Sequence, residues 1–422
     1  MFSLALNAPL PADLPPRWQL RFTLPGHSGP LLAAGTLQAS WEGGRVLFSL
    51  GYDCGRPPLG LSASAQPGDE VLLDVGPARL GLYVNGALRD EEWPLGRPLL
   101  SGPCRRLAMP AAIRPSGPLP APAPEAPASL QGWKPRNRGD NFHIGDCMPF
   151  VQGDTFHLFC LYDRRGHQSK WGLGAHQWGH LCSGDLRSWR ELPLAVAIDR
   201  PEEGSICTGS VAYHAGIYYA FYAIRACDGS PARLSWSTSA DGVHFVKSGR
   251  TFSLGPPYDA PSARDPKVFR DEQGLFHMLV TTSLVGAGES RGCLAHLTSP
   301  DLLRWTQLGP LVTLDIADQP ECTDYFYRQG FYYLIYSNFG VARYFLSRSP
   351  LGPWTAPAHN VVVDRDYRVP KCALWRGRIL FAGFRIDPGV QWGGRVHMYE
   401  AHQEADGSLR FGGVPEMPGI SE

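Results

Sequence analysis

The feature that most constrains the fold is a turn that recurs through the last two thirds of the chain. In five segments, Ser, Asp or Gly residues lead to an aromatic residue, namely Trp189, Phe245, Trp305, Trp354 and Phe411. These aromatic residues follow one another at intervals of about 50–60 residues. Apolar runs typical of strands precede the turns, as in Ile217-Tyr-Tyr-Ala-Phe-Tyr. Units of this length with several short strands are typical of propeller blades. The repeat therefore predicts an all-β fold that contains a five-bladed β-propeller.

The first part of the chain has a different pattern. It shows short alternating stretches such as Trp18-Gln-Leu-Arg-Phe-Thr-Leu, and it places Asn85-Gly86 between two apolar runs. An Asn-Gly pair in that setting is a strong signal for a tight hairpin. We predict a small β-sandwich over residues 1–109, which resembles the concanavalin-like sandwiches found in lectins. Sugar binding and packing against the rest of the chain both fit this module, and packing is the favoured role.

A proline-rich segment separates the two parts. Between Pro110 and Ala128 the chain reads Arg-Pro-Ser-Gly-Pro-Leu-Pro-Ala-Pro-Ala-Pro-Glu-Ala-Pro. Proline at this density favours neither a helix nor a central strand, so we expect a semi-rigid extended linker over residues 110–135. The propeller then occupies residues 136–422.

Charge and composition exclude several classes of partner. Lys+Arg and Asp+Glu both number 39, and no basic stretch indicates nucleic acid or a membrane surface. No stretch approaches the ~18 apolar residues of a membrane helix, and the region of Met1 lacks the pattern of a secretory signal. The ten cysteines fall singly. We therefore expect a cytoplasmic protein with buried free thiols, no nucleic-acid partner and no membrane partner, while the oligomeric state stays open.

Three acidic residues stand in short motifs, and each opens a different repeat. They are Asp146 in Gly-Asp-Cys-Met-Pro, Asp265 in Arg-Asp-Pro-Lys-Val and Glu321 in Pro-Glu-Cys-Thr-Asp. A toroidal fold brings the starts of its inner strands to one axial pocket. Three converging carboxylates suit cleavage of a glycosidic bond, which needs a proton donor, a carboxylate facing the anomeric carbon and a group that fixes the sugar. Other acidic residues lie in the repeated turns and are interpreted as turn formers, namely Asp185, Asp241 and Asp301.

The motifs carry a family resemblance. Trp178-Gly-His-Leu, Thr208-Gly-Ser-Val, Arg264-Asp-Pro-Lys and Glu321-Cys follow one another in successive repeats. In this order they resemble glycoside hydrolase family 32, the invertases, inulinases and levanases, over about Gly145 to Gly413. The resemblance implies that Asp146 is the nucleophile, Asp265 the stabiliser of ring hydroxyls and Glu321 the acid/base. It further implies a retaining, exo-acting enzyme on a glycoside or oligosaccharide that carries a β-fructofuranoside or a related furanoside.

The chain also departs from the family pattern. The family typically reads Asn-Asp-Pro-Asn-Gly around its nucleophile, whereas this chain reads Gly-Asp-Cys-Met-Pro from Gly145. A glutamine that contacts the sugar in the family corresponds to Leu161. The family's additional sandwich follows its propeller, whereas here a sandwich precedes it. Two alternatives stay open: an inverting furanosidase of the arabinanase and xylosidase type, and a carbohydrate-binding propeller that has lost catalysis.

Further residues are candidates for substrate binding, namely Arg264, Ser210, Trp171, Trp178 and Trp392. Arg264 either keeps Asp265 ionised or contacts a hydroxyl. Trp171 is expected in the pocket wall, Trp178 fits the pocket or blade packing, and Trp392 is a candidate to close the pocket. As a general acid, Glu321 needs a raised pKa, which we expect from nearby Asp146 and a partly dry pocket. His143, His176 and His180 lack partners at metal-ligand spacing, so neither a metal nor another cofactor is predicted.

Overall fold

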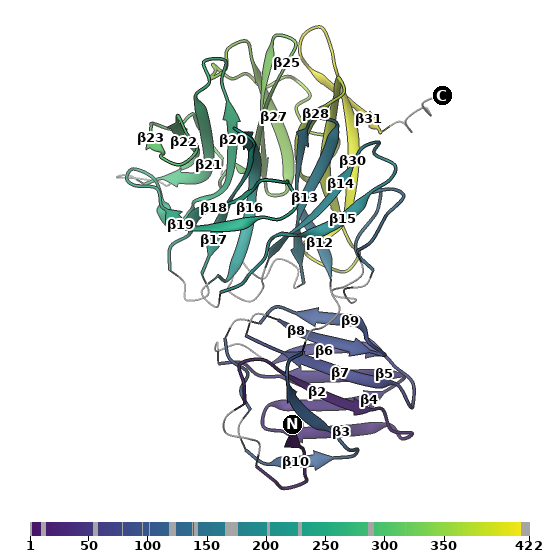
Figure 1. Cartoon of the computed structure of the whole chain (residues 1–422). Coiled ribbons are helices and arrows are strands. Elements are labelled where there is room, and N and C mark those ends of the chain that lie inside the picture. Colours follow the sequence, from purple (N-terminus) through teal and green to yellow (C-terminus); the bar gives the residue numbers. More distant parts are fainter. Residues whose placement is uncertain are drawn as a thin grey trace.

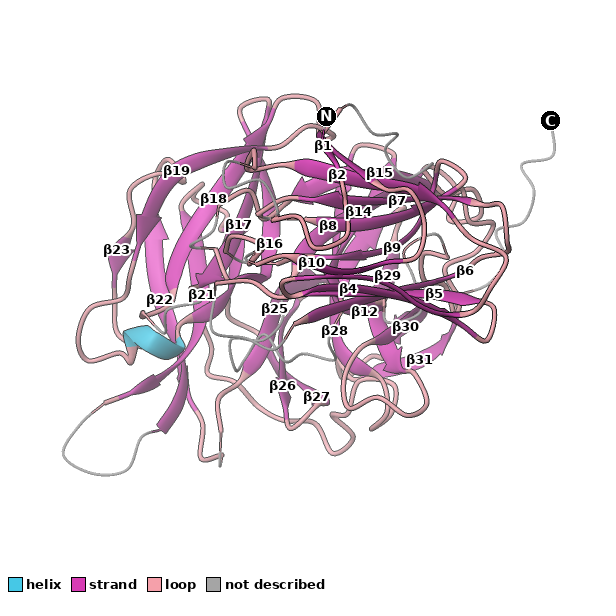
Figure 2. Ribbon diagram, turned by 90° about the horizontal axis from the view of Figure 1, so that it is seen from below, coloured by secondary structure: helices cyan, strands magenta, loops and turns pink. Residues whose placement is uncertain are grey.

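The structure is a computed structural model in which two all-β parts follow one another along the chain (Figure 1). It describes residues 2–9, 14–53, 58–77, 79–94, 96–100, 102–117, 124–136, 138, 142–164, 176–200, 203–226, 230–285, 291–316 and 318–414. Strands dominate in the view from the sandwich side, where the short 3₁₀ helix η2 (Ala260–Ser262) lies beside β21 (Phe276–Leu284) (Figure 2).

The N-terminal part is a sandwich of two antiparallel sheets. One sheet has the order β1-β11-β2-β7-β8-β9 and the other β10-β3-β4-β5-β6. A single apolar core that includes Trp18 and Phe48 fills the space between them. The strands are β1 (Phe2–Ser3), β2 (Trp18–Thr23), β3 (Gly29–Ala34), β4 (Leu37–Glu42), β5 (Arg45–Leu50), β6 (Leu59–Ser64), β7 (Glu70–Val75), β8 (Leu80–Val84), β9 (Ala87–Glu92), β10 (Cys104–Leu107) and β11 (Ala112–Pro115).

The predicted hairpin at Asn85-Gly86 is confirmed. These two residues connect β8 to β9, with φ angles of 51° and 77°. Both angles lie in the left-handed region that a two-residue turn between twisted strands requires, and Asn and Gly adopt it most readily.

The C-terminal part is the predicted propeller. Blade I comprises β12 (His143–Gln152), β13 (Thr155–Asp163), β14 (Gln177–Ser183) and β15 (Arg190–Val196), and blade II comprises β16 (Ser205–His214), β17 (Ile217–Arg225), β18 (Arg233–Ser239) and β19 (Val246–Phe252). Blade III comprises β20 (Arg264–Arg270), β21, β22 (Arg291–Ser299), β23 (Thr306–Gln307) and β24 (Val312–Thr313). Blade IV comprises β25 (Glu321–Arg328), β26 (Phe331–Asn338) and β27 (Val341–Ser347), and blade V comprises β28 (Arg368–Trp375), β29 (Arg378–Ile386), β30 (Gly394–Gln403) and β31 (Leu409–Gly413).

The first strand of each blade faces the axis. β12 contacts β16, β16 contacts β20, β20 contacts β25, β25 contacts β28, and β28 returns to β12. These contacts close a ring of five inner strands. A bridge between Ile144 and Gly394 further joins blades I and V into one sheet.

The repeated turns are built as the sequence predicts. In each of three turns an aspartate accepts hydrogen bonds from two backbone N–H groups two and three residues further on: Asp185 from Arg187 and Ser188, Asp241 from Val243 and His244, and Asp301 from Leu303 and Arg304. The interpretation of these three aspartates as turn formers is confirmed.

The predicted linker is shorter than residues 110–135. β11 pairs with β2 on one side and with β1 on the other, so the start of this range belongs to the sandwich. The expectation that it holds no central strand was wrong, because Ala112-Ile-Arg precedes the dense run of prolines and keeps its backbone donors. At the other end, Glu125 and Pro127 bond to the backbone of blade I, and Trp133 bonds to Val396 of blade V. Residues 124–133 thus span the seam between the last blade and the first.

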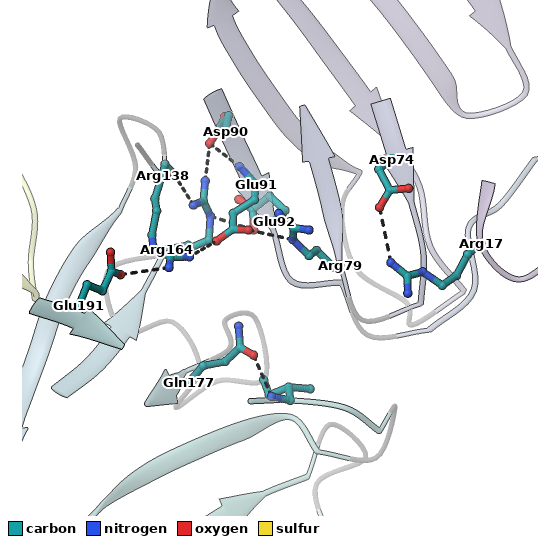
Figure 3. Close-up of polar contacts among 11 residues, drawn as sticks. Arg17, Asp74, Arg79, Asp90, Glu91, Glu92, Arg138, Arg164, Gln177 and Glu191 are labelled. Atoms are coloured by element: carbon teal, nitrogen blue, oxygen red, sulfur yellow. Dashed lines mark hydrogen bonds and ion pairs between the residues drawn. The ribbon is translucent and has the colours of Figure 1, made fainter. Parts of the chain in front are cut away.

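A buried network of charges joins the sandwich to the propeller (Figure 3). Arg138 donates to Glu91 of β9 at 3.0 Å and to Glu191 of β15 at 3.2 Å. Arg164, at the end of β13, pairs with Asp90 of the sandwich. All five side chains are buried, which fits the packing role for the module. Binding of sugar by the sandwich stays a prediction.

The eight cysteines within the described residues are all buried free thiols. In the same part of the chain, no helix is long and apolar enough to cross a membrane. No group of three or more potential metal-binding side chains occurs among the residues that the structure covers.

Candidate active site

A break in strand pairing at the same place in every blade creates the site. The register between the first and second strand shifts once in each blade, between residues 144 and 147, 206 and 209, 264 and 267, 321 and 324, and 368 and 371. A bulge redirects side chains out of the regular alternation. Because the five inner strands surround one axis, the five bulges turn their side chains toward a common space.

That space is a pocket of about 350 Å³ at one end of the axis. It contains all three predicted acidic residues, Asp146 from blade I, Asp265 from blade III and Glu321 from blade IV. The remaining lining residues are Leu161, His176, Cys207, Thr208, Arg225, Arg264, Asp318, Cys322, Phe339, Gly340, Arg368, Val369, Ile386, Gln391 and Trp392. Three carboxylates that lie far apart in the sequence therefore meet in one pocket.

Asp146 is buried and accepts from two side chains. Thr208 Oγ1 donates a hydrogen bond to its Oδ2 atom, and the Cys322 thiol lies 3.1 Å from the same oxygen. Burial raises the pKa of Asp146, and the charge of Asp265 raises it further, while the two donors act in the opposite direction. The ionised form of Asp146 thus depends on these donors and on positive charge nearby.

Asp265 and Cys322 occupy the bulges of blades III and IV. Their φ angles are 54° and 51°, in the left-handed region that costs a non-glycine residue on the order of 1–3 kcal/mol. The backbone N–H of Cys322 donates to Asp265 Oδ2 at 2.8 Å, which ties the two bulges together. This hydrogen bond fixes the orientation of the Asp265 carboxylate, which is 3% exposed.

Arg264 contacts two of the acids. Its Nη2 atom donates to Glu321 Oε1 at 2.9 Å, and its Nε atom lies 3.8 Å from Asp265 Oδ2. Burial alone would lower the pKa of Arg264, but the charges of Asp265 and Glu321 raise it above its ordinary value. Arg264 was predicted either to keep Asp265 ionised or to contact a hydroxyl, and it lies closer to Glu321 than to Asp265. A guanidinium at this distance stabilises the ionised carboxylate.

Two predicted binding residues lie outside the pocket. Trp178 is fully buried in the core, and its Nε1–H donates to Cys207 O at 2.9 Å, so it packs blade I against blade II. Ser210 bonds to the backbone of blade III, donating to Pro266 O and accepting from Val268 N, both at 2.9 Å. Assigning Ser210 to substrate binding was wrong, because the bulge that turns Thr208 into the pocket ends before Ser210. Trp171 lies outside the described residues.

Trp392, which was a candidate to close the pocket, lines it. Its ring stacks on His176 at a centroid distance of 5.2 Å and meets Phe384 edge to face. His176 is held in turn by Asp163, with 2.8 Å between Nε2 and Oδ1. Leu161 also lines the pocket, so the position where the family pattern has an amide presents an apolar side chain here.

Several pocket residues were missed by reasoning from the sequence. Thr208 and Cys322 were quoted only as parts of motifs, although both contact Asp146. Arg225 and Arg368 line the pocket from the end of β17 and the start of β28. Their positions at strand ends on the side of the acidic motifs were the available signal, but nothing in the sequence shows which strand ends meet.

Several known proteins resemble this chain in sequence. Residues 148–354 match the family model described as the glycosyl hydrolases family 32 N-terminal domain. A probable sucrose-6-phosphate hydrolase of Psychromonas ingrahamii is 29% identical over 209 residues, which is 47% of this chain and 36% of the relative. The sucrose-6-phosphate hydrolase of Bacillus subtilis is 30% identical over 180 residues, 40% of this chain and 36% of that protein. The chain thus spans little more than a third of the length of these relatives.

Solved structures share the fold. A GH32 β-fructofuranosidase of Bombyx mori superimposes with a TM-score of 0.53 at 18% identity, over 65% of each chain. Fructan 1-exohydrolase IIa of Cichorium intybus superimposes with a TM-score of 0.54 at 16% identity, over 66% of this chain and 60% of that one. The matched family model and the ordered motifs support the interpretation of the chain as a divergent member of glycoside hydrolase family 32, and the solved structures show the shared fold.

Proposed function

We propose that the chain is a glycosidase that cleaves β-fructofuranosides, or a related furanoside, with retention of configuration. The observation that carries this proposal is the convergence of Asp146, Asp265 and Glu321 from three blades into one pocket. Relatives named sucrose-6-phosphate hydrolase and β-fructofuranosidase support the substrate class.

In the proposed reaction, the ionised Asp146 attacks the anomeric carbon while Glu321 gives its proton to the leaving oxygen. The bond from the anomeric carbon to that oxygen breaks, and a glycosyl ester of Asp146 forms. Glu321 then takes a proton from a water molecule, which attacks the ester and releases the sugar. Asp265 holds ring hydroxyls as positive charge develops on the ring. Retention requires the carboxyl groups of Asp146 and Glu321 to lie about 5–5.5 Å apart, and inversion 6.5–9.5 Å.

The proton donor role of Glu321 requires a change at Arg264. With the guanidinium 2.9 Å from its carboxylate, Glu321 is stabilised in the ionised form. We infer that a bound sugar competes for Arg264 through one of its hydroxyls and so frees Glu321 to hold a proton. Arg264 then takes part in substrate binding, as the motif suggests.

Two further arginines favour a substrate that carries an anionic group. Arg225 and Arg368 line the pocket, and no carboxylate among the described residues forms an ion pair with Arg225. Within the described part of the chain, the carboxylate paired with Arg368 is that of the largely exposed Asp366, 3.9 Å away. Arginine binds phosphate through paired donors. We therefore propose a phosphorylated fructofuranoside such as sucrose 6-phosphate as the preferred substrate over sucrose.

The test is turnover of sucrose, sucrose 6-phosphate, a fructan and aryl arabinofuranosides by the wild type and by Asp146→Asn. We expect the wild type to release fructose, together with glucose 6-phosphate from sucrose 6-phosphate, and the variant to lose at least 10³-fold in turnover. Equal release by both proteins would refute the assignment, and release from the arabinofuranosides alone would make the related furanoside, and not fructose, the substrate. Tight sugar binding without turnover would instead favour a binding propeller, and product of inverted configuration would favour the inverting alternative.

A further inference from the structure

A second layer of side chains lies directly beyond the bulges, on the far side of the acids. The first residues after the five bulges are Cys147, Gly209, Lys267, Asp324 and Lys371. Four of them line no part of the acidic pocket but a separate cavity of about 310 Å³, namely Gly209, Lys267, Asp324 and Lys371. The layer therefore separates two cavities on the axis, and it carries two lysines and one aspartate.

The charges of this layer are unevenly paired. Lys267 of blade III forms an ion pair with Asp324 of blade IV, and Asp324 also accepts a hydrogen bond from the backbone N–H of Cys372. Among the described residues, no carboxylate forms an ion pair with Lys371. Its Nζ atom donates instead to the backbone carbonyl of Gly209 at 2.9 Å. One positive charge in the layer is thus left without a counter-charge of its own.

Lys371 reaches across the axis. It belongs to blade V and Gly209 to blade II, which are not neighbours in the ring. The side chain is buried, with 2% exposure. A Cβ atom at position 209 would lie 1.7 Å from Phe221 O, so glycine is needed for the inner strand to lie where its carbonyl meets the lysine. The lysine side chain therefore lies across the axis between the two cavities.

Some of the charged groups close to Lys371 belong to the acidic pocket. Burial lowers the pKa of Lys371, while the charges of Cys322, Asp324 and Asp265 act to raise it. Four acidic residues line the acidic pocket, Asp146, Asp265, Asp318 and Glu321, and Arg264 compensates the charges of Glu321 and Asp265. The side-chain donors to Asp146 among the described residues are the uncharged Thr208 and Cys322, and the charge of His176 also lowers its pKa. Lys371 adds positive charge on the side of Asp265 and Cys322.

We propose that Lys371 is a positioning residue of the active site, which closes the floor of the pocket and supplies positive charge beneath Asp265 and Cys322. This inference deepens the proposed function and rests on it for its kinetic consequence. A closed floor makes the pocket single-ended, so that only the terminal sugar of a substrate enters it. A fixed ammonium in a dry site acts more strongly than the same charge in water.

The experiment compares Lys371→Met and Lys371→Gln with the wild type. Methionine keeps most of the length of the side chain and removes the charge, whereas glutamine, of the same length as methionine, offers an uncharged donor toward Gly209 O. We expect both variants to lose about 10²-fold in kcat, the scale of one preorganised electrostatic partner, with KM for the best substrate within about threefold. Lys247→Met is the matched control, because Lys247 is a largely buried lysine of the outer strand β19, and it should keep the wild-type kcat. Full activity in folded Lys371→Gln would overturn the electrostatic role.

A second measurement does not depend on turnover. The groups facing Lys371 are Asp265 and Lys267 from β20 and Cys322 and Asp324 from β25. The ammonium of Lys371 stabilises the thiolate of Cys322, so alkylation of Cys322 by iodoacetamide at alkaline pH, mapped by mass spectrometry, should be at least threefold slower in both variants. An unchanged rate refutes the proposal. If the wild type cleaves no furanoside but the thiol rate falls, the proposed function fails and the placement of the charge stands.

Discussion

The indole ring of Trp392 occupies the space that a side chain at position 145 would need. A Cβ atom on Gly145 would lie 2.0 Å from Cη2 of Trp392. The departure at Gly145 from the family's Asn-Asp-Pro-Asn-Gly pattern therefore has a physical counterpart in blade V. An aromatic ring stands beside the backbone of Asp146, where the family pattern has an amide.

This contact predicts that Gly145→Ala displaces Trp392. We expect a loss of about 1–3 kcal/mol in the free energy of unfolding and a raised KM, because the ring must leave His176 or the strand must shift. The same substitution in a Trp392→Ala background should cost much less, since the space is then free. Urea unfolding and sucrose 6-phosphate kinetics on the four proteins check this, and equal costs in both backgrounds would show that the ring is not the obstacle.

Cys322 is expected to set the acidic limb of the activity profile. Its thiol is one of two side-chain donors to Asp146, and such donors lower the pKa of that carboxyl. In Cys322→Ala the pKa of Asp146 rises, so the ionised nucleophile is lost at a higher pH as the solution is acidified. The acidic limb of kcat/KM should therefore move upward, while Cys293→Ala, at a buried thiol of blade III outside the pocket, leaves it in place. A limb that does not move would mean that the thiol contributes nothing to the ionisation of Asp146.

Glu321→Gln should affect substrates according to their leaving groups. A natural sugar needs protonation of its leaving oxygen, and an activated aryl group needs little. General acid catalysis contributes roughly 10²–10⁴-fold, so the loss on sucrose 6-phosphate should exceed the loss on an activated aryl fructofuranoside by about that range. Steady-state kinetics on both substrates measure the difference. Equal losses on the two would mean that Glu321, held by Arg264, only positions the sugar.

The fold and the three acidic residues of the pocket could be predicted from the sequence more reliably than the orientation of individual side chains. The ordered motifs were enough to predict the blades and the convergence of Asp146, Asp265 and Glu321, because repeat spacing fixes which strand starts face the axis. Ser210 was misplaced because a one-residue bulge reverses which side chains face the axis, and no residue type marks it reliably. Lys371 was overlooked because its role depends on Gly209, a residue of another blade.

The contacts between the sandwich and the propeller also could not be predicted from the sequence. Asp90-Glu91-Glu92 reads as an exposed acidic run after a hairpin, yet all three side chains are buried against the propeller. Their partners Arg138 and Arg164 lie 47 and 74 residues further along the chain. No local sequence pattern connects residues that are so far apart. Contacts of this kind depend on how two folded units meet, which is a property of their surfaces.

Glu91→Gln should destabilise the junction strongly. Burial alone would raise the pKa of Glu91, but Arg138, Arg79 and Arg164 lower it below the ordinary glutamate value. Removing one partner of a buried ion pair costs about 3–5 kcal/mol. Glu70→Gln, which breaks a surface pair with Arg21, should cost less than about 1 kcal/mol. Differential scanning calorimetry of both variants measures the contrast, and similar small losses would show that the junction contributes little to stability.

Two pairs of buried histidines should make the propeller sensitive to acid. His157 and His180 contact each other at 3.0 Å in blade I, and His277 and His296 at 2.8 Å at the matching place in blade III. Burial lowers the pKa of His157 to about 4, and it lowers the pKa of His180 as well. The unfolded chain then binds more protons than the folded one below the ordinary histidine value of 6.5. Stability is thus fully present above that value and is lost as the pH falls toward 4.

The double variant His157→Phe with His180→Phe tests this source of acid sensitivity. Replacing both partners by rings of similar shape leaves no unsatisfied polar group, so the cost at neutral pH should be small. We expect the free energy of unfolding, measured in urea from pH 7 to pH 4.5, to fall less steeply in this variant than in the wild type. His244→Gln, at an exposed histidine, should keep the wild-type slope. An unchanged slope in the double variant would place the acid sensitivity elsewhere, with the blade III pair His277 and His296 as the next groups to replace.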